Sequence, residues 1–384
     1  MKIGFLSHLD MNLYLFRLPI MQRLREEGHE VYAICPKGDK FDAFKKYGII
    51  PVAYEISRSS LNPMKELKAI YNIYRALKPL DLDMLHTFTA KPNIYGTIAG
   101  RWASVPVILN LVEGLGSFYV SDSRKNRMVR GVIEKLYTFV FSQSDGVVFV
   151  NSDDPKYLGN KGVISKEKIH IIKSVGIDTE RFSMDRIDTA ETERLKEKLG
   201  LKDKVVVLMV ARAIWDKGVR EFYEAAQMLK KEGKVQFVLV GDIDEGNPSS
   251  ADAAFLRSGE VLWLGHRDDI VNLTAMCDIY VLPSYREGVP RTLLEAASMA
   301  RPIVTTDTVG CREVVEDGYN GYLIPVRNAK ILSQKIQYLA ENSGIREVMG
   351  KNGRILAENM FDIHTVVDQY MALYRSLMKQ KGIR

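Results

Sequence analysis

The chain has 384 residues, of which 46% are hydrophobic, and at roughly 150 residues per domain this length predicts about two domains. The composition excludes a disordered or fibrous protein, and no apolar run approaches the ~20 residues that span a bilayer. The net charge is +6, but residues 1–178 carry 25 basic and 18 acidic residues while the remainder is close to neutral. A basic half predicts an anionic partner: nucleic acid, a phosphorylated substrate or an acidic membrane surface.

Short β-rich runs alternate with amphipathic helical stretches along the chain. In the first half the expected strands are Lys2–Leu6, Val31–Ile34, Met84–Thr87, Val107–Leu111 and Gly146–Val150, with helices that include Phe16–Glu27 and Leu67–Leu77. The second series of strands is Val205–Val210, Gln236–Val240, Val261–Gly265, Ile279–Leu282, Ile303–Thr305 and Gly321–Ile324. This order predicts an α/β protein with two Rossmann-like doubly wound domains facing a cleft. Ligands bind beyond the carboxyl ends of such strands, so functional residues are expected in the loops that follow them.

The polar segment after Gly176-Ile177-Asp178 marks the expected domain boundary. We expect domains at 1–178 and 179–360, and a long helix at 361–384. The start of the chain does not resemble a signal peptide. Three widely spaced cysteines, Cys35, Cys277 and Cys311, predict reduced thiols and no zinc site, so we expect a soluble intracellular protein.

The segment from Arg286 to Glu295 follows a strand and opens a helix. Pro290 suits the first helical turn, and the amides that follow it form an anion site. Glu287 in the loop and Glu295 in the helix are expected to converge on the hydroxyl groups of one polyhydroxy ligand. The alternative is that Glu287 ends a turn and Glu295 is a solvated helix residue.

A second cluster follows the strand Val205–Val210. Arg212 and Lys217 lie five residues apart at the end of that strand, and Gly218 and a helix come next. A planar guanidinium and a compact ammonium in this position are able to clamp a diphosphate. The alternative is two exposed cations. A glycosidase-like carboxylate pair explains the two glutamates but leaves the cations without a role.

The order Arg212…Lys217, Gly265-His266-Arg267 and Glu287-x7-Glu295 resembles the family 4 glycosyltransferases, which have the GT-B fold. The resemblance covers the whole chain and implies a retaining, nucleotide-sugar-dependent, metal-independent enzyme without a cofactor. It implies that Arg212 and Lys217 hold the donor diphosphate. It also implies that Glu295 binds the ribose, that Glu287 binds the transferred sugar, and that Arg267 lies beside the base. The loop that meets phosphate and sugar comprises Gly288, Val289, Pro290, Arg291 and Thr292. The long carboxyl-terminal helix is expected to cross back onto the first domain.

Two Asp-x-Asp matches raise the question of a metal. Asp81-Leu82-Asp83 reads as a helix-to-strand turn, whereas Asp242 and Asp244 lie at a strand end in a glycine-rich loop. We favour a turn for the second pair as well, because the diphosphate already has two cations, and we expect no metal.

The first domain departs from the family pattern. After Val107–Leu111, where many members carry histidine, this chain has Glu113, which we expect to contact the transferred sugar or to accept the acceptor proton. The alternative is that Glu113 forms a salt bridge or belongs to a turn. The predicted catalytic residues are thus Glu113, Arg212, Lys217 and Glu287. The predicted acceptor-binding residues are His8, Asn12, His86, Gly114 and Gly116. His8 and His86 have the alternative of being core histidines.

Three stretches resemble a subgroup, the PglA-type enzymes of bacterial N-glycosylation: Ser57–Pro63, Glu113–Tyr119 and Lys173–Asp178. That resemblance implies α-1,3 transfer of N-acetylgalactosamine from UDP-GalNAc to polyprenyl-diphosphate-linked N,N′-diacetylbacillosamine. The other possibility is an enzyme of capsule, O-antigen or exopolysaccharide synthesis that uses another UDP-sugar. The non-enzymatic alternatives are an anion- or sugar-binding module without turnover and a nucleic-acid-binding protein, for which no recognised motif is present.

A lipid-linked acceptor requires the enzyme to reach a membrane surface. The segment Ser123–Gln143 interleaves basic and apolar residues, which is typical of an interfacial helix, and Leu61–Lys78 is a second candidate. The basic residues expected to face the membrane are Arg124, Lys125, Arg127 and Arg130. A core helix with solvated basic residues is the alternative. We expect a peripheral protein at the cytoplasmic face of the inner membrane.

Overall fold

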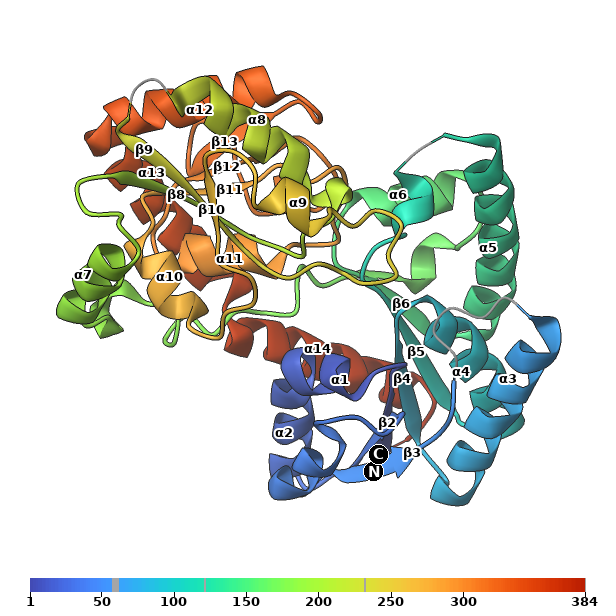
Figure 1. The fold of residues 1–384 in the computed structure, drawn as a ribbon. Helices are drawn as coiled ribbons and strands as arrows, with labels where there is room; N and C mark the ends of the chain where they lie inside the picture. The colour runs from blue at the N-terminus through green and yellow to red at the C-terminus, as the bar shows by residue number, and fades with distance from the viewer. Residues whose placement is uncertain (57–61, 121, 231–232, 384) are drawn as a thin grey trace. The chain divides into compact units, whose positions relative to one another are not determined.

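The computed structural model describes residues 1–56, 62–120, 122–230 and 233–383. The chain forms two units: Met1–Gly176 with Ile363–Arg384 makes unit 1, and Ile177–Asp362 makes unit 2 (Figure 1). These divisions lie two residues from the boundaries expected at 178 and 360. Of the subgroup stretch Ser57–Pro63, residues 57–61 lie outside the described part of the chain, as does Leu61 of the second basic segment.

Unit 1 is built on a parallel sheet of order β3-β2-β1-β4-β5-β6-β7. Its strands are β1 (Lys2–Leu6), β2 (Glu30–Cys35), β3 (Ile50–Ala53), β4 (Met84–Phe88), β5 (Val107–Val112), β6 (Gly146–Phe149) and β7 (Ile169–Ile171). Its helices are α1 (Asp10–Phe16), α2 (Leu18–Glu26), α3 (Pro63–Leu77), α4 (Ala90–Trp102), α5 (Arg124–Gln143), α6 (Asp153–Asn160) and α14 (Ile363–Gln380). Helices α1, α2 and α14 cover one face of the sheet, and α3 and α4 cover the other (Figure 1).

Unit 2 is built on a second parallel sheet, of order β10-β9-β8-β11-β12-β13. Its strands are β8 (Val205–Val210), β9 (Val235–Val240), β10 (Val261–Trp263), β11 (Ile279–Leu282), β12 (Ile303–Thr306) and β13 (Gly321–Ile324). Its helices are α7 (Thr189–Lys198), α8 (Val219–Leu229), α9 (Ala253–Leu256), α10 (Ile270–Met276), α11 (Arg291–Ser298), α12 (Ala329–Glu341) and α13 (Ser343–Leu356). The predicted doubly wound α/β architecture is thus confirmed for both units.

The central strands have the sequence of strands buried on both faces. All six residues of β5, Val-Ile-Leu-Asn-Leu-Val, are buried, as expected for a parallel sheet covered by helices on each side. The sequence did not predict two of the strands, β3 and β7. These strands have four and three residues, and none of their residues is fully buried. β3 also contains Pro51, which suits the margin of a sheet and interrupts the strand pattern.

The prediction of a single helix at Phe16–Glu27 is wrong at its amino-terminal end. The chain forms α1 and α2 separately, and Arg17 is the residue between them, with φ of −121°. Pro19 lacks the amide that would bond to the carbonyl of Leu15, and its ring would clash there, so one continuous helix cannot form. The break turns the Arg17 side chain into the interior, where it is fully buried.

The carboxyl-terminal helix begins at Ile363, because residues Ala357–Phe361 form a π-helical turn first. It packs on α2 within unit 1 and buries an apolar face that includes Tyr370 and Tyr374. Gly176 has φ of 82°, and a Cβ there would lie 2.8 Å from the Cα of Ile363, so only glycine fits beside this connection. In the described part of the chain, no helix combines the length and the apolar character needed to cross a membrane.

In each unit the strand order reverses at one place, between β1 and β4 and between β8 and β11. In sheets of this topology ligands bind at such a reversal, beyond the carboxyl ends of the strands. In unit 2 the loops that follow these strands contain Arg212 and Lys217 after β8, and Glu287 after β11. In unit 1 they contain His8 after β1 and Thr89 after β4.

Candidate active site

Three loops of unit 2 are tied together at the carboxyl ends of β8, β11 and β12. Gly218 has φ of 78°, and a Cβ there would lie 2.2 Å from the carbonyl oxygen of Pro283, so only glycine fits where the first two loops meet. The amide of Tyr285 donates to the carbonyl of Asp216 (2.9 Å), and the Thr308 hydroxyl donates to the carbonyl of Tyr285 (2.9 Å). These hydrogen bonds therefore fix the backbone of the three loops relative to one another.

Lys217 and Glu287 form an ion pair within this assembly. The Lys217 Nζ lies 2.5 Å from Glu287 Oε1, and the two side chains are 22% and 10% exposed. The amide of Glu287 donates to the carbonyl of Val309 (3.1 Å), and a Cβ at Gly310 would lie 2.1 Å from the Gly288 carbonyl oxygen. The loop after β12 thus holds the backbone of Glu287, and Glu287 holds the ammonium of Lys217.

Arg212 has a counterion of its own. Its Nη1 lies 2.5 Å from Asp244 Oδ2, and the Asn247 side chain also donates to that carboxylate (2.8 Å). About half of the Arg212 side chain is exposed, so the guanidinium is accessible to an anion from solvent. The two predicted diphosphate ligands therefore pair with different carboxylates on different loops.

The Asp-x-Asp residues are engaged in turns and ion pairs. Asp242 Oδ1 accepts a bond from the amide of His266 (2.9 Å), and Asp244 pairs with Arg212. Asp83 Oδ2 accepts from the amide of Lys2 (2.7 Å). Among the residues that the structure describes, no group of three or more His, Cys, Asp or Glu side chains is placed to hold a metal ion, and the three cysteines are buried free thiols.

Helix α11 begins one residue later than the sequence suggested. Pro290 was expected inside the first turn, but its ψ of 116° is extended, so it caps the helix, which begins at Arg291. The first amides of a helix have no acceptor within the helix, and the helix dipole favours an anion beside them. The amides of Arg291 and Thr292 belong to this turn.

Glu295 is the most perturbed carboxyl group of the site. Its side chain is nearly buried, and the guanidinium of Arg291 lies one helical turn away at 3.2 Å. Burial raises the pKa of Glu295 to about 7, against the opposing effects of Arg291 and Arg181. A carboxyl group with this pKa changes its charge, and hence its capacity to accept hydrogen bonds, near neutral pH.

Arg267 follows β10 and forms a two-pronged ion pair with Asp269, at 2.8 and 2.5 Å. About a third of each side chain is exposed. The edge of the guanidinium is occupied by the carboxylate, so its flat face is the part suited to stacking on a base.

At the end of β1 in unit 1, His8 and Asn12 are half-buried. His8 Nδ1 lies 2.8 Å from the hydroxyl of Thr89, and Ser7 donates to Asn12 Oδ1 (3.3 Å). Thr89 has φ of 75°, a strained conformation for a β-branched residue that is typical of functional sites. Both predicted residues are thus held at the carboxyl edge of the sheet.

His86 does not reach a ligand surface, which corrects the expectation that it binds acceptor. Its side chain is fully buried, and its Nδ1 lies 2.7 Å from the hydroxyl of Tyr374 on α14. The rings of Phe5 and Phe88 pack around it. Burial, assisted by the charge of Arg17, lowers the pKa of His86 well below its usual value, so the ring is neutral. The sequence placed His86 correctly on β4, and of its two interpretations the core histidine is the one that the structure supports.

Glu113 directly follows β5 and is paired with a residue that the sequence did not single out. Its Oε1 accepts from Nη2 of the buried Arg17, and its own side chain is 29% exposed. Gly114 and Gly116 follow with φ of 149° and 84°, conformations that favour glycine. The loop thus turns sharply just after the carboxylate.

The basic segment forms α5, but its four predicted cations differ in exposure. Arg124, Lys125 and Arg127 are exposed. Arg130 instead bonds to Asp122, its side chain is 15% exposed, and its guanidinium lies 5.7 Å from the centre of the Tyr119 ring, so it is less accessible than the other three. The helix also exposes the apolar side chains Met128, Val132, Leu136 and Phe139.

A second pair missed by the sequence supports the donor loops. The Tyr285 hydroxyl lies 2.9 Å from Glu221 Oε1 on α8, and the guanidinium of Arg327 lies 4.6 Å from the centre of the Tyr285 ring. Burial, followed by the bond to Glu221, raises the pKa of Tyr285 to about 12. The only sequence signal for this pair was the position of Tyr285 two residues before Glu287.

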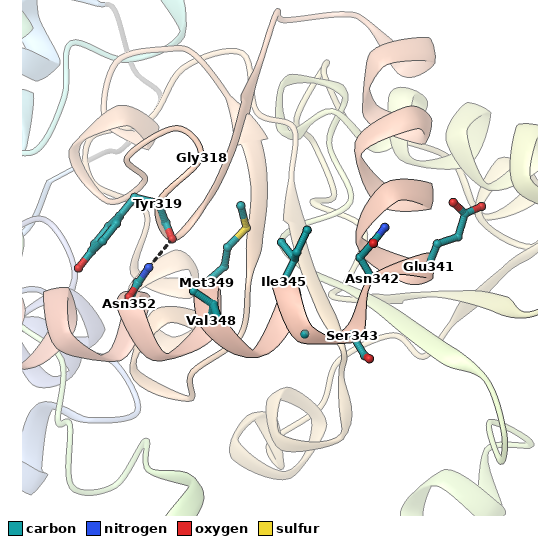
Figure 2. Close-up of a pocket in the computed structure, with 10 residues that line it drawn as sticks. Gly318, Tyr319, Glu341, Asn342, Ser343, Ile345, Val348, Met349 and Asn352 are labelled. Atoms are coloured by element: carbon teal, nitrogen blue, oxygen red, sulfur yellow. Dashed lines mark hydrogen bonds between the residues drawn. The ribbon is translucent and has the colours of Figure 1, made fainter.

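A groove of about 560 Å³ lies elsewhere in unit 2 (Figure 2). Gly318 and Tyr319 precede β13, and Asn342 joins α12 to α13, so the groove lies at the amino-terminal edge of the sheet. The Tyr319 carbonyl accepts from the Asn352 side chain there (2.9 Å; Figure 2). The groove is therefore separate from the loops at the carboxyl ends of the strands.

Each unit matches a family of glycosyltransferases: residues 2–151 match "Glycosyl transferase 4-like" and residues 191–356 match "Glycosyl transferases group 1". The N,N′-diacetylbacillosaminyl-diphospho-undecaprenol alpha-1,3-N-acetylgalactosaminyltransferase of Campylobacter jejuni is 41% identical over 99% of this chain and 100% of that protein. The UDP-Gal:alpha-D-GlcNAc-diphosphoundecaprenol alpha-1,3-galactosyltransferase of Escherichia coli is 28% identical over 93% of this chain and 92% of that protein.

Solved structures share the fold. A glycosyltransferase from Rickettsia africae is 21% identical, with a TM-score of 0.80 over 98% of each chain. Anabaena Alr3699/HepE in complex with UDP and glucose is 20% identical, with a TM-score of 0.80 over 98% of this chain and 100% of that one. Two Rossmann-like units, with cationic loops at the switch point of unit 2, thus define a nucleotide-sugar-dependent glycosyltransferase of the GT-B fold. The chain belongs to family 4 of these enzymes, as its motifs predicted, in the group that contains the Campylobacter enzyme.

Proposed function

We propose that the protein transfers N-acetylgalactosamine from UDP-GalNAc, with retention, to N,N′-diacetylbacillosamine on a polyprenyl diphosphate. The new linkage is α-1,3, and the step belongs to glycan assembly for protein N-glycosylation. The likeness to the Campylobacter enzyme over 99% of the chain supports this substrate pair. The Lys217–Glu287 pair at the switch point of unit 2 is the structural observation that carries the chemistry.

In this proposal unit 2 binds the donor. Departure of UDP places negative charge on the diphosphate, and fixed cations and amides stabilise that charge in the transition state. Lys217 and Arg212 supply the cations, and the first turn of α11 supplies the amides. Glu295 accepts hydrogen bonds from the ribose hydroxyls, and Glu287 accepts one from a hydroxyl of the transferred sugar. Arg267 lies beside the base. These groups account for the charge without a metal ion, so the transfer is metal-independent.

Unit 1 binds the acceptor. His8 and Asn12 at the end of β1, and Glu113 with Gly114 and Gly116 at the end of β5, are the residues assigned to this role. Their position at the carboxyl edge of the sheet, and the strain at Thr89 beside His8, support the assignment.

Unit 1 also docks on the membrane that holds the lipid acceptor. On α5 the exposed Met128, Val132 and Phe139 lie within one face, and Lys125 flanks them. Helix α4 packs between α3 and α5, and α3 adds the exposed Met64, Leu67 and Tyr71. Each cation near an anionic leaflet contributes about 1 kcal/mol, so the exposed basic residues suffice for reversible docking at the cytoplasmic face of the inner membrane.

A thermal-shift panel of nucleotide sugars tests the donor assignment. A ligand at 100 times its Kd stabilises the folded state by about 2.7 kcal/mol, which is readily measured. We expect UDP-GalNAc to raise Tm more than UDP-Gal, UDP-GlcNAc or GDP-sugars, and UDP itself to retain most of the effect. Preference for UDP-Gal, the donor of the Escherichia coli relative, would instead indicate a polysaccharide enzyme with another sugar.

A further inference from the structure

Arg17 is a fully buried arginine at the helix break in unit 1. Its guanidinium lies 4.7 Å from the centre of the Phe88 ring and reaches the Glu113 carboxylate at the carboxyl end of β5. Arginine is among the residue types least often buried without a partner, and removing its charge from water is costly unless a counterion compensates it. The described part of the chain gives Arg17 one ion-pair partner, Glu113.

The groups around Arg17 other than Glu113 are neutral. Burial, assisted by the Arg17 charge, lowers the pKa of His86, and burial raises the pKa of Tyr370 to about 12 and that of Tyr374 further. Within the described residues, the Nε and Nη1 of Arg17 have no hydrogen-bond partner. The attraction of the buried cation is therefore directed at one carboxylate.

A buried guanidinium with two unsatisfied nitrogens contributes poorly to stability, because an apolar side chain of similar volume avoids both penalties. This argues for a role in holding Glu113. The ion pair engages Oε1, while 29% of the Glu113 side chain remains exposed at the edge of the sheet, so the carboxylate is still accessible to a ligand.

We infer that Arg17 is a positioning residue that fixes the Glu113 carboxylate as a hydrogen-bond acceptor for a hydroxyl group of the carbohydrate substrates. The inference rests on the proposed glycosyl transfer and adds to it the residue that orients the acceptor-side carboxylate. Arg17 acts through Glu113 and touches no substrate itself.

A double-mutant cycle of Arg17→Met and Glu113→Gln tests the inference, with kcat and both KM values measured for each variant. We expect Arg17→Met to lower kcat/KM about 10- to 100-fold in the wild-type background and less than about threefold in Glu113→Gln. A higher KM for the acceptor assigns the hydroxyl to the acceptor sugar, and a higher KM for the donor assigns it to the transferred sugar. Equal losses in both backgrounds, or full activity of Glu113→Gln, would overturn the inference.

Arg101→Met is the matched control, since Arg101 pairs with Asp145 (2.7 Å) near the start of β5 in the same unit. It is expected to lower Tm and to change kcat/KM by the same factor in both backgrounds. If Arg17→Met fails to fold, Arg17→Lys, which keeps the charge, replaces it in the same double-mutant cycle. We then expect a smaller loss of kcat/KM, again confined to the background that retains Glu113. UDP binding by calorimetry stays unchanged in every variant, because the donor groups lie in unit 2. If the wild type transfers a different sugar, the proposed function fails while the cycle remains measurable with that sugar.

Discussion

Replacing Lys217 by alanine removes an ammonium that the structure holds 2.5 Å from Glu287 on the donor loops. A unit charge about 4 Å from a diphosphate oxygen contributes about 4 kcal/mol at an effective dielectric constant near 20. The Lys217 side chain is only 22% exposed, so solvent screens this interaction incompletely. At about 1.4 kcal/mol for each factor of ten in rate, we expect kcat to fall about 100- to 1000-fold.

The assay is the initial rate of UDP release in the presence of acceptor, together with urea unfolding of each variant. Lys230→Ala is the control, because Lys230 and Glu260 form an ion pair of similar length (2.6 Å) in the same unit, with both partners more exposed. It should leave kcat within about twofold, since surface pairs contribute little. A folded Lys217→Ala variant with near-normal kcat, or with no greater loss than the control, would refute the assignment of Lys217 to the leaving group.

Four further predictions concern the site and α5. Because the pKa of Glu295 is raised to about 7, the carboxylate protonates as pH falls through that value, so donor KM should rise below pH 7 in the wild type but not in Glu295→Gln. The same raised pKa makes the stability contributed by the protonated group decline as pH rises from 4.5 to about 7, which unfolding of the two proteins will show. EDTA should leave transfer unchanged; a strict manganese requirement would assign Asp242 and Asp244 to a metal. Exchanging Arg124, Lys125 and Arg127 for serine should release the protein from anionic liposomes, whereas the same exchange at Lys196, Lys198 and Lys202 should not.

The sequence predicted the architecture well because the buried parallel strands are continuous apolar runs. Four of them, including β1 and β8, have the predicted bounds. β3 and β7 were missed because short strands with half-exposed residues lack that pattern. Helix ends were less accurate, because caps such as Pro290 depend on one backbone angle that composition does not determine.

The candidate donor residues could be proposed from the sequence because their spacing after a strand is local and recurs in a known family. The ion pairs that they form were not predicted, since the Lys217–Glu287 and Arg212–Asp244 pairs join residues 70 and 32 positions apart. The Arg17–Glu113 pair spans 96 positions, and a lone arginine before Leu18-Pro19 gives no sign of burial. The buried position of His86 likewise depends on α14, whose packing on unit 1 brings Tyr374 to it.

Product analysis of a single reaction tests the proposed function. Purified protein, UDP-GalNAc and N,N′-diacetylbacillosamine on a polyprenyl diphosphate are incubated, and the lipid-linked product is analysed by mass spectrometry and NMR. We predict one added N-acetylhexosamine in an α-1,3 linkage, formed with UDP-GalNAc and not with UDP-GlcNAc. A lipid-linked acceptor left unchanged by UDP-GalNAc, or a β-linked product, would contradict the proposal.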